Sequence, residues 1–420
     1  MLKKKNPAKV RNGLVAALDI GTTKVSCFIA KPGGIGGARI LGIGHHVSKG
    51  LRCGTIIDMD AAEAAIRSTV EAAEQMAGDN IHGVMVNVAG ANLQSRLIAY
   101  EISIAGHQIG DPDLRRVLDL SSPFAEKPAD HELIHAIPVG YSIDGNRGVR
   151  DPRGMYGQRL GVNVHLVTAA SGPIRNLLAT IARCHLDVEA MMVAPYASAL
   201  ASLVDDEIQL GVTLIDMGGG TTTVAVFFDG ELVHAGCVPV GGVHVTNDIA
   251  RGLSTPLAQA ERMKTLYGNA IPSPADDREM ITVPLIGDDG GVESQQVPRS
   301  MLVGIIRPRI EETFELVRAH LENTGFDKVA GRRVVLTGGA SQMPGVREVA
   351  GLILDKQVRL GRPKPIEGLA ESVSGPAFST CAGLLLAALK KPAEAQGAYR
   401  PSEEPNGRLG RIGQWIRENF

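Results

Sequence analysis

The stretch Ala17-Leu18-Asp19-Ile20-Gly21-Thr22-Thr23-Lys24 decides the fold, because nearly the same chemistry returns at Ile215-Asp216-Met217-Gly218-Gly219-Gly220-Thr221-Thr222. Each stretch follows one apolar run typical of a buried strand and leads into another, at 14–18 and 25–30 in the first case and at 212–215 and 224–228 in the second. We therefore expect two similar hairpins, each with a polar, glycine-rich turn.

These turns have the composition of phosphate-binding loops. Glycine lets the backbone turn sharply and lets a phosphate approach the exposed N–H groups, while threonine hydroxyls add donors. Asp19 and Asp216, at the strand ends, are placed to hold a hydrated divalent cation. One Asp-x-Gly turn alone is typical of an ordinary hairpin, but the duplication favours two loops that clamp the charged tail of one nucleotide. The expected loop residues are Gly21, Thr22, Thr23 and Lys24 in the first hairpin and Gly218, Gly219, Gly220, Thr221 and Thr222 in the second.

Composition limits the other possibilities. A chain of 420 residues with 44% hydrophobic residues should form two or more domains. Its formal net charge of −2 provides no global field that would attract nucleic acid, so no nucleic-acid partner is expected. The five cysteines are scattered without zinc-like spacing and are expected to be reduced thiols in a cytoplasmic protein. No apolar run approaches the about 20 residues that span a bilayer.

The order of predicted strands and helices changes within the segment between the two hairpins. Strand, helix and strand patterns at 97–104, 111–120 and 131–143 precede a Gly/Arg-rich loop at 145–157, which predicts a small inserted subdomain. The segment 164–170 returns to the character of a core strand. Further helices are expected at 173–184, 195–204, 244–253, 256–267 and 301–321, the last with a kink at Pro308.

A third glycine turn, Thr337-Gly338-Gly339-Ala340-Ser341, follows a strand pattern at 334–336. Such a turn can simply serve helix–strand packing. Beside two phosphate loops, we expect Gly338, Gly339, Ala340 and Ser341 to seat an adenosine, because glycine lets the base and ribose lie flat against the backbone. The next helix, 378–389, is rich in small residues that allow a close helix crossing between two lobes.

The C-terminal tail differs from the rest of the chain. Residues 390–406 are rich in proline and charge, which predicts a flexible linker. The last segment, 407–420, could dock on the core as a final helix, but its tether and its arginines favour an amphipathic helix that binds an anionic membrane. Its apolar face would be Leu409, Ile412, Trp415, Ile416 and Phe420.

The order of these features resembles the superfamily of actin, Hsp70 and sugar kinases. A closer resemblance, to the FtsA family of bacterial cell-division proteins, rests on six motifs: 18–24, 195–199, 216–221, 239–242 with 246–250, 336–341, and the tethered terminal helix. A pilus-assembly actin homologue of the PilM type is the main alternative and lacks such a tail. A sugar kinase is a weaker alternative, because no catalytic Asp stands out, and a chaperone of the Hsp70 type would need a long substrate-binding domain.

The FtsA resemblance implies an α/β fold of two actin-like lobes, built from duplicated ribonuclease-H-like domains around an ATP cleft. It implies a first lobe (1A) at 12–89 and 165–205, an inserted subdomain (1C) at 90–164, a second lobe (2A) at 206–250 and 331–389, and a subdomain 2B at 251–330. It also implies ATP with Mg²⁺ as the ligand, held in part by Gly242 and by Glu261 and Lys264 at the ribose. Because the helix start at 194–197 offers no acid or amide, we expect at most slow ATP hydrolysis.

The resemblance further implies the partners. They are the C-terminal peptide of FtsZ on subdomain 2B, with Arg309 at a position linked to that contact, further copies of this chain in a filament through 1C and the lobes, later division proteins, and membrane lipid. The implied place of action is the cytoplasmic face of the inner membrane at the division septum, where the protein would tether FtsZ filaments.

Overall fold

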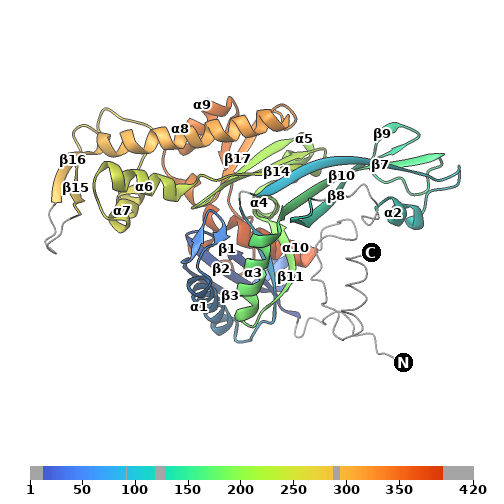
Figure 1. Ribbon diagram of the computed structural model, residues 1–420, viewed down its shortest axis with the longest axis horizontal. Coiled ribbons are helices and arrows are strands. Elements are labelled where there is room, and N and C mark those ends of the chain that lie inside the picture. The colour runs from blue at the N-terminus through green and yellow to red at the C-terminus, as the bar shows by residue number, and fades with distance from the viewer. Residues whose placement is uncertain (1–12, 91, 119–127, 287–293, 391–420) are drawn as a thin grey trace.

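The computed structural model describes residues 13–90, 92–118, 128–286 and 294–390. They form two lobes whose central sheets share one topology (Figure 1). The first sheet has the order β11-β6-β1-β2-β3, and the second has the order β14-β13-β12-β17-β18. The strands of the first are β1 (Val15–Ile20), β2 (Lys24–Pro32), β3 (Ala38–Val47), β6 (Gly83–Val88) and β11 (Asp187–Val193). Those of the second are β12 (Val212–Met217), β13 (Thr222–Phe228), β14 (Glu231–Val238), β17 (Arg333–Thr337) and β18 (Gln357–Leu360).

The strand directions confirm the duplication. In each lobe three consecutive strands form an antiparallel meander, and the first of them also pairs in parallel with a fourth strand that pairs in parallel with a fifth. Crossover helices connect the parallel strands, as parallel pairing requires. The two predicted hairpins are therefore β1–β2 and β12–β13, and they occupy the same position in the two sheets.

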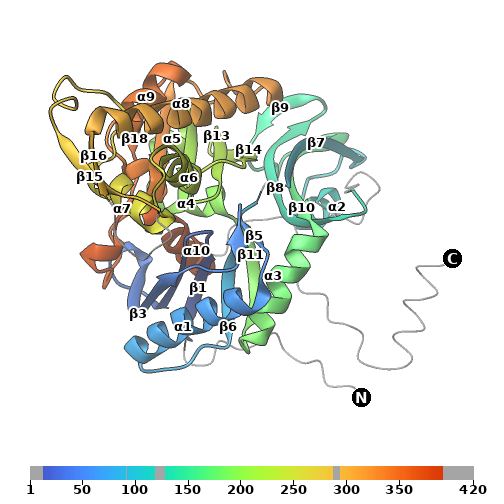
Figure 2. The same cartoon turned by 60° about the vertical axis from the view of Figure 1, so that its left-hand side comes forward.

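Helices cover both faces of each sheet. In the first lobe, α1 (Met59–Ala77) and α3 (Ser171–Arg183) pack on one face through Ile66, Val70 and Ile181 (Figure 2). In the second lobe, α6 (Gly242–Gly252), α8 (Arg299–Thr324) and α9 (Val346–Leu354) cover the corresponding face. The predicted amphipathic helices thus bury their apolar stripes as their periodicity requires.

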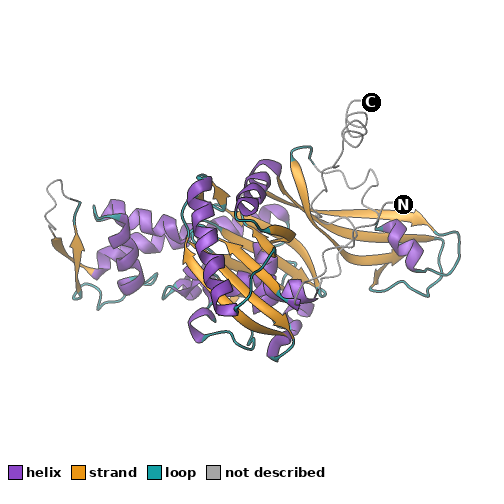
Figure 3. Cartoon of the chain, turned by 90° about the horizontal axis from the view of Figure 1, so that it is seen from below, coloured by secondary structure: helices purple, strands orange, loops and turns teal. Residues whose placement is uncertain are grey.

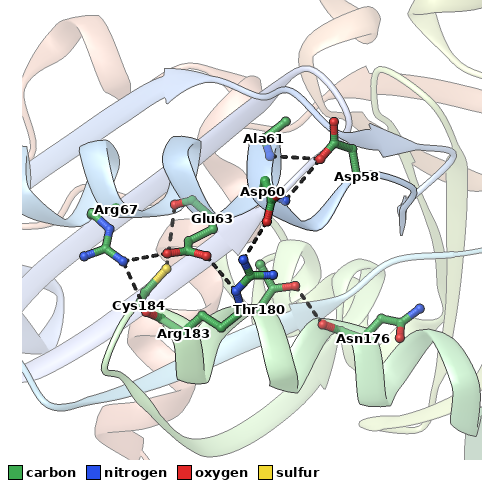
Figure 4. A network of polar contacts seen from close by, with 9 residues as sticks. All are labelled: Asp58, Asp60, Ala61, Glu63, Arg67, Asn176, Thr180, Arg183 and Cys184. Carbon is green, nitrogen blue, oxygen red and sulfur yellow. Dashed lines mark hydrogen bonds and ion pairs between the residues drawn. The ribbon is translucent and has the colours of Figure 1, made fainter.

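A polar network joins α1 to α3 at the surface of the first lobe (Figure 4). The Asp58 side chain accepts hydrogen bonds from the backbone N–H groups of Asp60 and Ala61 and so caps α1. Arg183, at the end of α3, forms ion pairs with Asp60 at 2.5 Å and with Glu63 at 2.7 Å. These partly exposed pairs connect the two helices and add little stability each.

The inner faces of the two sheets are covered by helices that cross each other. The helix α4 (Ala194–Ser202) follows the first lobe but buries Ala199 and the adjoining Leu203 against the second sheet. The helix α10 (Ser379–Lys390) follows the second lobe but buries Leu384 and Leu385 against the first. At the crossing, a Cβ built on Gly383 would lie 1.7 Å from the carbonyl oxygen of Ala197, so the predicted close approach of small residues is confirmed.

The inserted subdomain is a sheet of order β7-β10-β8-β9 with one helix, α2 (Asp111–Val117). Its strands are β7 (Leu93–Ser103), β8 (His131–Ile143), β9 (Asn146–Val149) and β10 (Arg159–Ala170). The segment 164–170 is the core strand that the sequence predicts, and Val167 and Ala169 pack in the core of the first lobe. Its strand, β10, nevertheless belongs to the inserted sheet, because it pairs with β7 and β8 along its whole length. The apolar pattern indicated a buried strand but carried no information on which sheet it joins. The predicted loop at 145–157 also contains the short strand β9.

A second small subdomain lies at the opposite end of the molecule from the inserted one (Figure 1 and Figure 3). It contains α7 (Leu257–Tyr267) and the hairpin of β15 (Met280–Pro284) and β16 (Ser294–Pro298), and α8 leads from it back along the second lobe. The helix α8 is continuous through Pro308. The described residues also form the short elements β4 (Leu51–Arg52), β5 (Thr55–Ile56) and α5 (Asp205–Leu210), and 3-10 turns at Ile35–Gly37, Gly339–Gln342, Glu371–Val373 and Pro376–Phe378.

Candidate functional site

The turns of the two hairpins have the same geometry. The N–H of Gly21 donates to the carbonyl of Lys24 at 3.0 Å, and the N–H of Gly218 donates to the carbonyl of Thr221 at 2.9 Å. A Cβ at Gly21 or at Gly218 would lie 2.8 Å or 3.0 Å from the same carbonyl. Both turns therefore depend on glycine at their first position.

The two loops lie directly against each other, although they are almost two hundred positions apart. A Cβ on Gly219 would lie 2.5 Å from the side chain of Thr23, and a Cβ on Gly220 would lie 2.5 Å from the Thr22 hydroxyl. The Thr22 hydroxyl also accepts a hydrogen bond from the N–H of Gly54, on the β4–β5 turn, at 3.1 Å. The loops thus form the facing walls of one site between the lobes.

The site is an elongated cleft with two connected parts. The first part contains both loops together with Asp19 and Asp216. The second part is lined by Glu261, Lys264 and the turn after β17. Both parts share the same lining residues at their junction: Thr23, Gly218, Gly219 and Gly339.

The two predicted metal carboxylates lie together in the first part. Asp19 and Asp216 are each only 7% exposed. Burial raises the pKa of Asp19 to about 7, with Lys24 opposing this rise and Asp216 adding to it. Burial also raises the pKa of Asp216, but hydrogen bonds from Ser198 and Thr380 and the charge of Lys24 oppose it. Two buried carboxylates at one place create a demand for positive charge.

Lys24 supplies part of that charge. Its Nζ donates to the carbonyl oxygen of Ala377 at 2.5 Å and lies 3.2 Å from the centroid of the Phe378 ring. Burial lowers the pKa of Lys24, while the neighbouring Asp19 opposes this. This lysine therefore links the first hairpin to the segment before α10.

The second part of the cleft contains the expected adenosine turn. The turn begins at Gly338, which lines the first part; it has a φ of +87°, and a Cβ there would lie 2.3 Å from Oδ1 of Asp216, so only glycine fits. In the second part, Lys264 Nζ forms an ion pair with Glu261 at 2.6 Å and donates to the carbonyl of Gly242 at 3.1 Å and to Thr246. Gly339 and Ala340 line this part as well.

Two of the predicted loop residues do not line either part. The Thr222 hydroxyl donates to the carbonyl of Val240 at 2.8 Å, and the Ser341 hydroxyl donates to the carbonyl of Gly338 at 2.7 Å. Both therefore support the backbone of a turn. Sequence reasoning also missed lining residues, among them Gly54, Asn87 and Thr380. Asn87 could have been noticed as the polar residue near the end of a buried strand.

Arg309, the predicted partner residue, is held by its own chain. Its guanidinium forms a two-pronged ion pair with Asp248 of α6, at 2.5 Å and 3.1 Å, and another with Glu312. The neighbouring Ile310 and Thr313 line the cleft. Lys390, the first residue of the predicted linker, ends α10; the rest of the linker and the membrane residues Leu409, Ile412, Trp415, Ile416 and Phe420 lie outside the described residues. In the part of the chain that is described, no helix has the length and apolarity needed to cross a membrane.

These residues fit a nucleotide with a hydrated divalent cation. The glycine turns expose backbone N–H groups to phosphates, and the buried carboxylates match the oxygen ligands that Mg²⁺ prefers. Among the described residues, no group of three or more His, Cys, Asp or Glu side chains could hold a metal. A cation here would therefore complete its shell with water and phosphate oxygens, as Mg²⁺ commonly does.

Solved structures share this fold at low sequence identity. The chain is similar to a protein of the PilM-PilN type IV pilus biogenesis complex, with a TM-score of 0.62 at 16% identity over 90% of this chain and 98% of the other. It is also similar to MreB5 of Spiroplasma citri bound to ADP, with a TM-score of 0.55 at 13% identity over 90% and 96% of the two chains. The fold is therefore the actin-like one that the sequence predicts.

Sequence comparisons identify the family. Residues 213–383 match the family model of cell division protein FtsA, and residues 90–168 match that of the SHS2 domain inserted in FtsA. The chain is 45% identical to the cell division protein FtsA of Agrobacterium fabrum over 98% of its own length and 96% of the relative. It is 37% identical to that of Pseudomonas aeruginosa, over 98% and 100%, and 30% identical to that of Escherichia coli K12, over 97% and 98%. The chain therefore belongs to the FtsA family of cell-division proteins.

Proposed function

We propose that this chain binds ATP with Mg²⁺ between its lobes, self-associates, and tethers FtsZ filaments to the cytoplasmic membrane at the division septum. Two matching glycine loops face each other across one cleft, with a buried carboxylate beside each loop. This observation supports the proposed binding of the nucleotide. Family membership carries the cell-division role.

Each part of the cleft would serve one part of the nucleotide. The backbone N–H groups of the two loops and Lys24 would hold the phosphates, while Asp19 and Asp216 would orient waters of the bound Mg²⁺. Glu261 and Lys264 would contact the ribose, and the turn at Gly338 would lie beside the adenosine. Because both lobes would bind one ligand, ATP would favour one relative position of the lobes.

Hydrolysis should be slow at most. Efficient phosphoryl transfer needs a group that orients the attacking nucleophile near the γ-phosphate. At the start of α4 the lining residue is Ala194, and the described lining of the phosphate part contains no Gln, Glu or His. Its two acids, Asp19 and Asp216, are assigned to the cation, and its one amide, Asn87, accepts a hydrogen bond from the N–H of Ile20. Phosphate release by the purified protein tests this, since turnover of roughly 1 to 100 per second, as in ordinary kinases, would contradict it.

The division-site functions would use other surfaces. We infer that subdomain 2B, residues 251–330, receives the C-terminal peptide of FtsZ, that 1C and the lobes make the contacts between copies, and that 407–420 binds lipid. Arg309 would act on the FtsZ contact by holding α8 against α6, because its charge is paired with Asp248. Recruitment of later division proteins would follow from the tethered filament.

Binding of labelled ATP to the full-length protein tests the nucleotide step. We expect saturable, Mg²⁺-dependent binding that is lost in Asp216→Asn and retained in Asp229→Asn, a variant of an exposed aspartate at the β13–β14 turn. Binding that does not respond to Asp216→Asn would overturn the proposed site.

Flotation with anionic liposomes tests the tethering step. Full-length protein should carry FtsZ to the liposomes, and a truncation before Lys390 should not. For the FtsZ contact, Arg309→Glu should weaken recovery, whereas Arg307→Glu, on the same helix, should not. Equal flotation of the full-length and truncated chains would remove the membrane step from the proposal.

A further inference from the structure

The Asp216 carboxylate is bound by the two crossing helices rather than by its own lobe alone. Ser198 of α4 donates its hydroxyl hydrogen to Oδ2 of Asp216 at 2.5 Å, and Thr380 of α10 donates to the same oxygen at 3.1 Å. The two hydroxyl oxygens lie 2.9 Å apart. Ser198 is fully buried, so its hydroxyl has no access to water that could replace the carboxylate.

These bonds select which carboxylate oxygen is available. Both hydroxyls contact Oδ2, and among the described residues no hydrogen bond is made to Oδ1. Oδ1 lies beside Gly338, where a Cβ would come within 2.3 Å of it. The oxygen that remains free is thus the one at the glycine turn that lines the cleft.

Asp19 lacks this arrangement. In the described chain no hydroxyl donates to its carboxylate, and Cys381 of α10, which contacts the first hairpin, directs its thiol to the backbone carbonyls of Ala17 and Ser26. A thiol is a weaker donor than a hydroxyl. The carboxylate of the second lobe is therefore fixed, while that of the first lobe is not held in this way.

We propose that Ser198 and Thr380 are positioning residues that orient Asp216 toward the nucleotide-bound cation from the crossing of α4 and α10. This inference rests on the proposed function, since it assumes that Mg²⁺ and ATP bind in the cleft. Groups that hydrogen-bond a metal-binding carboxylate fix its orientation, and their loss typically lowers metal affinity by about 10- to 100-fold.

The same crossing provides a matched control. Ser202 lies one turn further along α4, is also buried, and donates to the hydroxyl of Ser379 on α10 at 3.1 Å. Ser379 in turn contacts Thr337 and not a carboxylate. Replacing Ser202 therefore removes a hydroxyl pair from the same helix contact without touching Asp216.

The experiment measures the dissociation constant of ATP twice for each full-length variant, with excess Mg²⁺ and with EDTA. The ratio of the dissociation constant in EDTA to that in Mg²⁺ reports how much the cation strengthens ATP binding. A general packing defect changes both constants alike and leaves the ratio unchanged. We expect the ratio to fall about tenfold in Ser198→Ala and in Thr380→Val. Thr380→Ser, which keeps the hydroxyl, and Ser202→Ala should keep the wild-type ratio. Thermal unfolding shows whether each variant is folded. Because Ser198 and Thr380 are replaced separately, the inference can still be tested if one of the two variants does not fold.

The outcomes separate the two claims. A wild-type ratio in both Ser198→Ala and Thr380→Val overturns the inference and leaves ATP binding intact. An equal fall in Ser202→Ala also overturns it, because packing at the crossing would then be the cause. A wild-type protein that binds no ATP overturns the proposed function itself, and this is read from the wild type alone.

Discussion

The two glycine-loop hairpins, β1–β2 and β12–β13, have matching geometry but differ in the contacts that support them. Their turns close with the same hydrogen bond, at 3.0 Å and 2.9 Å, and their carboxylates are equally buried. The second hairpin is supported by helices: Ser198 and Thr380 hold Asp216, and the N–H groups of Gly242 and Val243, at the start of α6, donate to the carbonyls of Gly218 and Gly219. The first is supported by the small β4–β5 turn through Gly54 and by Lys24.

This difference suggests that the two lobes have different roles in binding the ligand. Two matching loops can contact one phosphate chain from opposite sides, but a site gains precision only where second-layer contacts fix its groups. The second lobe has such contacts and is the better candidate for a rigid reference. The first lobe carries the lysine and the less restrained carboxylate, so it is the candidate for the part that moves onto the ligand.

The largest expected effect comes from the helix crossing that both lobes share. Gly383→Ala would place a Cβ 1.7 Å from the carbonyl oxygen of Ala197, so α4 and α10 must separate. Overpacking of this kind costs about 3 kcal/mol of unfolding free energy. Urea unfolding measures it. Gly304→Ala is the control, because that exposed glycine within α8 has open space around it and its replacement should stabilise by about 0.5 to 1 kcal/mol. Equal effects of the two variants would mean that the lobes do not depend on a close crossing.

The next effect distinguishes the two lobes at the strand beside each carboxylate. Gly338, after β17, has a φ of +87° and no room for a Cβ next to Asp216, whereas Val88 occupies the matching position in the first lobe. Gly338→Ala should therefore displace Asp216 and weaken ATP binding about 100-fold, equivalent to about 2.7 kcal/mol. Gly351→Ala, in α9 and outside the lining of the cleft, is the control, since its nearest atom would be 3.5 Å away. Titration with labelled ATP compares them, and similar affinities would place the nucleotide elsewhere.

The edge strands β3 and β14 occupy matching positions and differ in exposure. His45 and His46 of β3 are exposed, whereas His234 of β14 is buried against His320, with 3.0 Å between their Nε2 atoms, and stacks on Phe326. Burial, together with His320, lowers the pKa of His234 to about 3. The unfolded chain therefore binds a proton below about pH 6.5 that the folded chain does not bind, so stability falls as the pH falls through this range.

This linkage gives a prediction for His234, one of several histidines, with His165 and His320, whose pKa is lowered by burial. His234 should contribute a loss of about 2 kcal/mol of unfolding free energy between pH 7.5 and pH 5. His234→Phe should remove most of that loss, and His46→Phe should leave it unchanged. Urea unfolding at the two pH values measures both. An unchanged pH dependence in His234→Phe would show that this histidine is protonated in the folded protein.

The sequence predicted the parts of the site that are encoded locally. Asp19, Gly21, Asp216 and Gly218 stand out because each turn and its flanking strands lie in one continuous stretch, 15–32 or 212–228, and a duplicated pattern is detectable at any separation. The edge strands β3 and β14 were missed, because short alternating segments with glycines, such as Gly42 and Gly44, give a weak strand signal.

What the sequence could not predict depends on how elements meet. Ser198 and Thr380 lie 18 and 164 positions from Asp216, and only the crossing of α4 with α10 brings them to it. Likewise, the apolar pattern of β10 indicated burial, while its assignment to the inserted sheet depends on pairing with β7 and β8. Arg309 was noticed as a cation, but its pairing with Asp248 required the packing of α6 on α8.

The smallest expected effect tests whether the two turns are equivalent. Gly21→Ala and Gly218→Ala each introduce a Cβ at 2.8 Å or 3.0 Å from the carbonyl that closes the turn. Each variant must shift its turn by a few tenths of an ångström and should weaken ATP binding about tenfold, equivalent to about 1.4 kcal/mol. Titration with labelled ATP in Mg²⁺ measures both. If the second hairpin is the rigid reference, Gly218→Ala should cost more than Gly21→Ala, because α6, Ser198 and Thr380 prevent its loop from relaxing. A larger loss in Gly21→Ala would reverse the assignment and make the first lobe, with Lys24, the fixed side of the cleft.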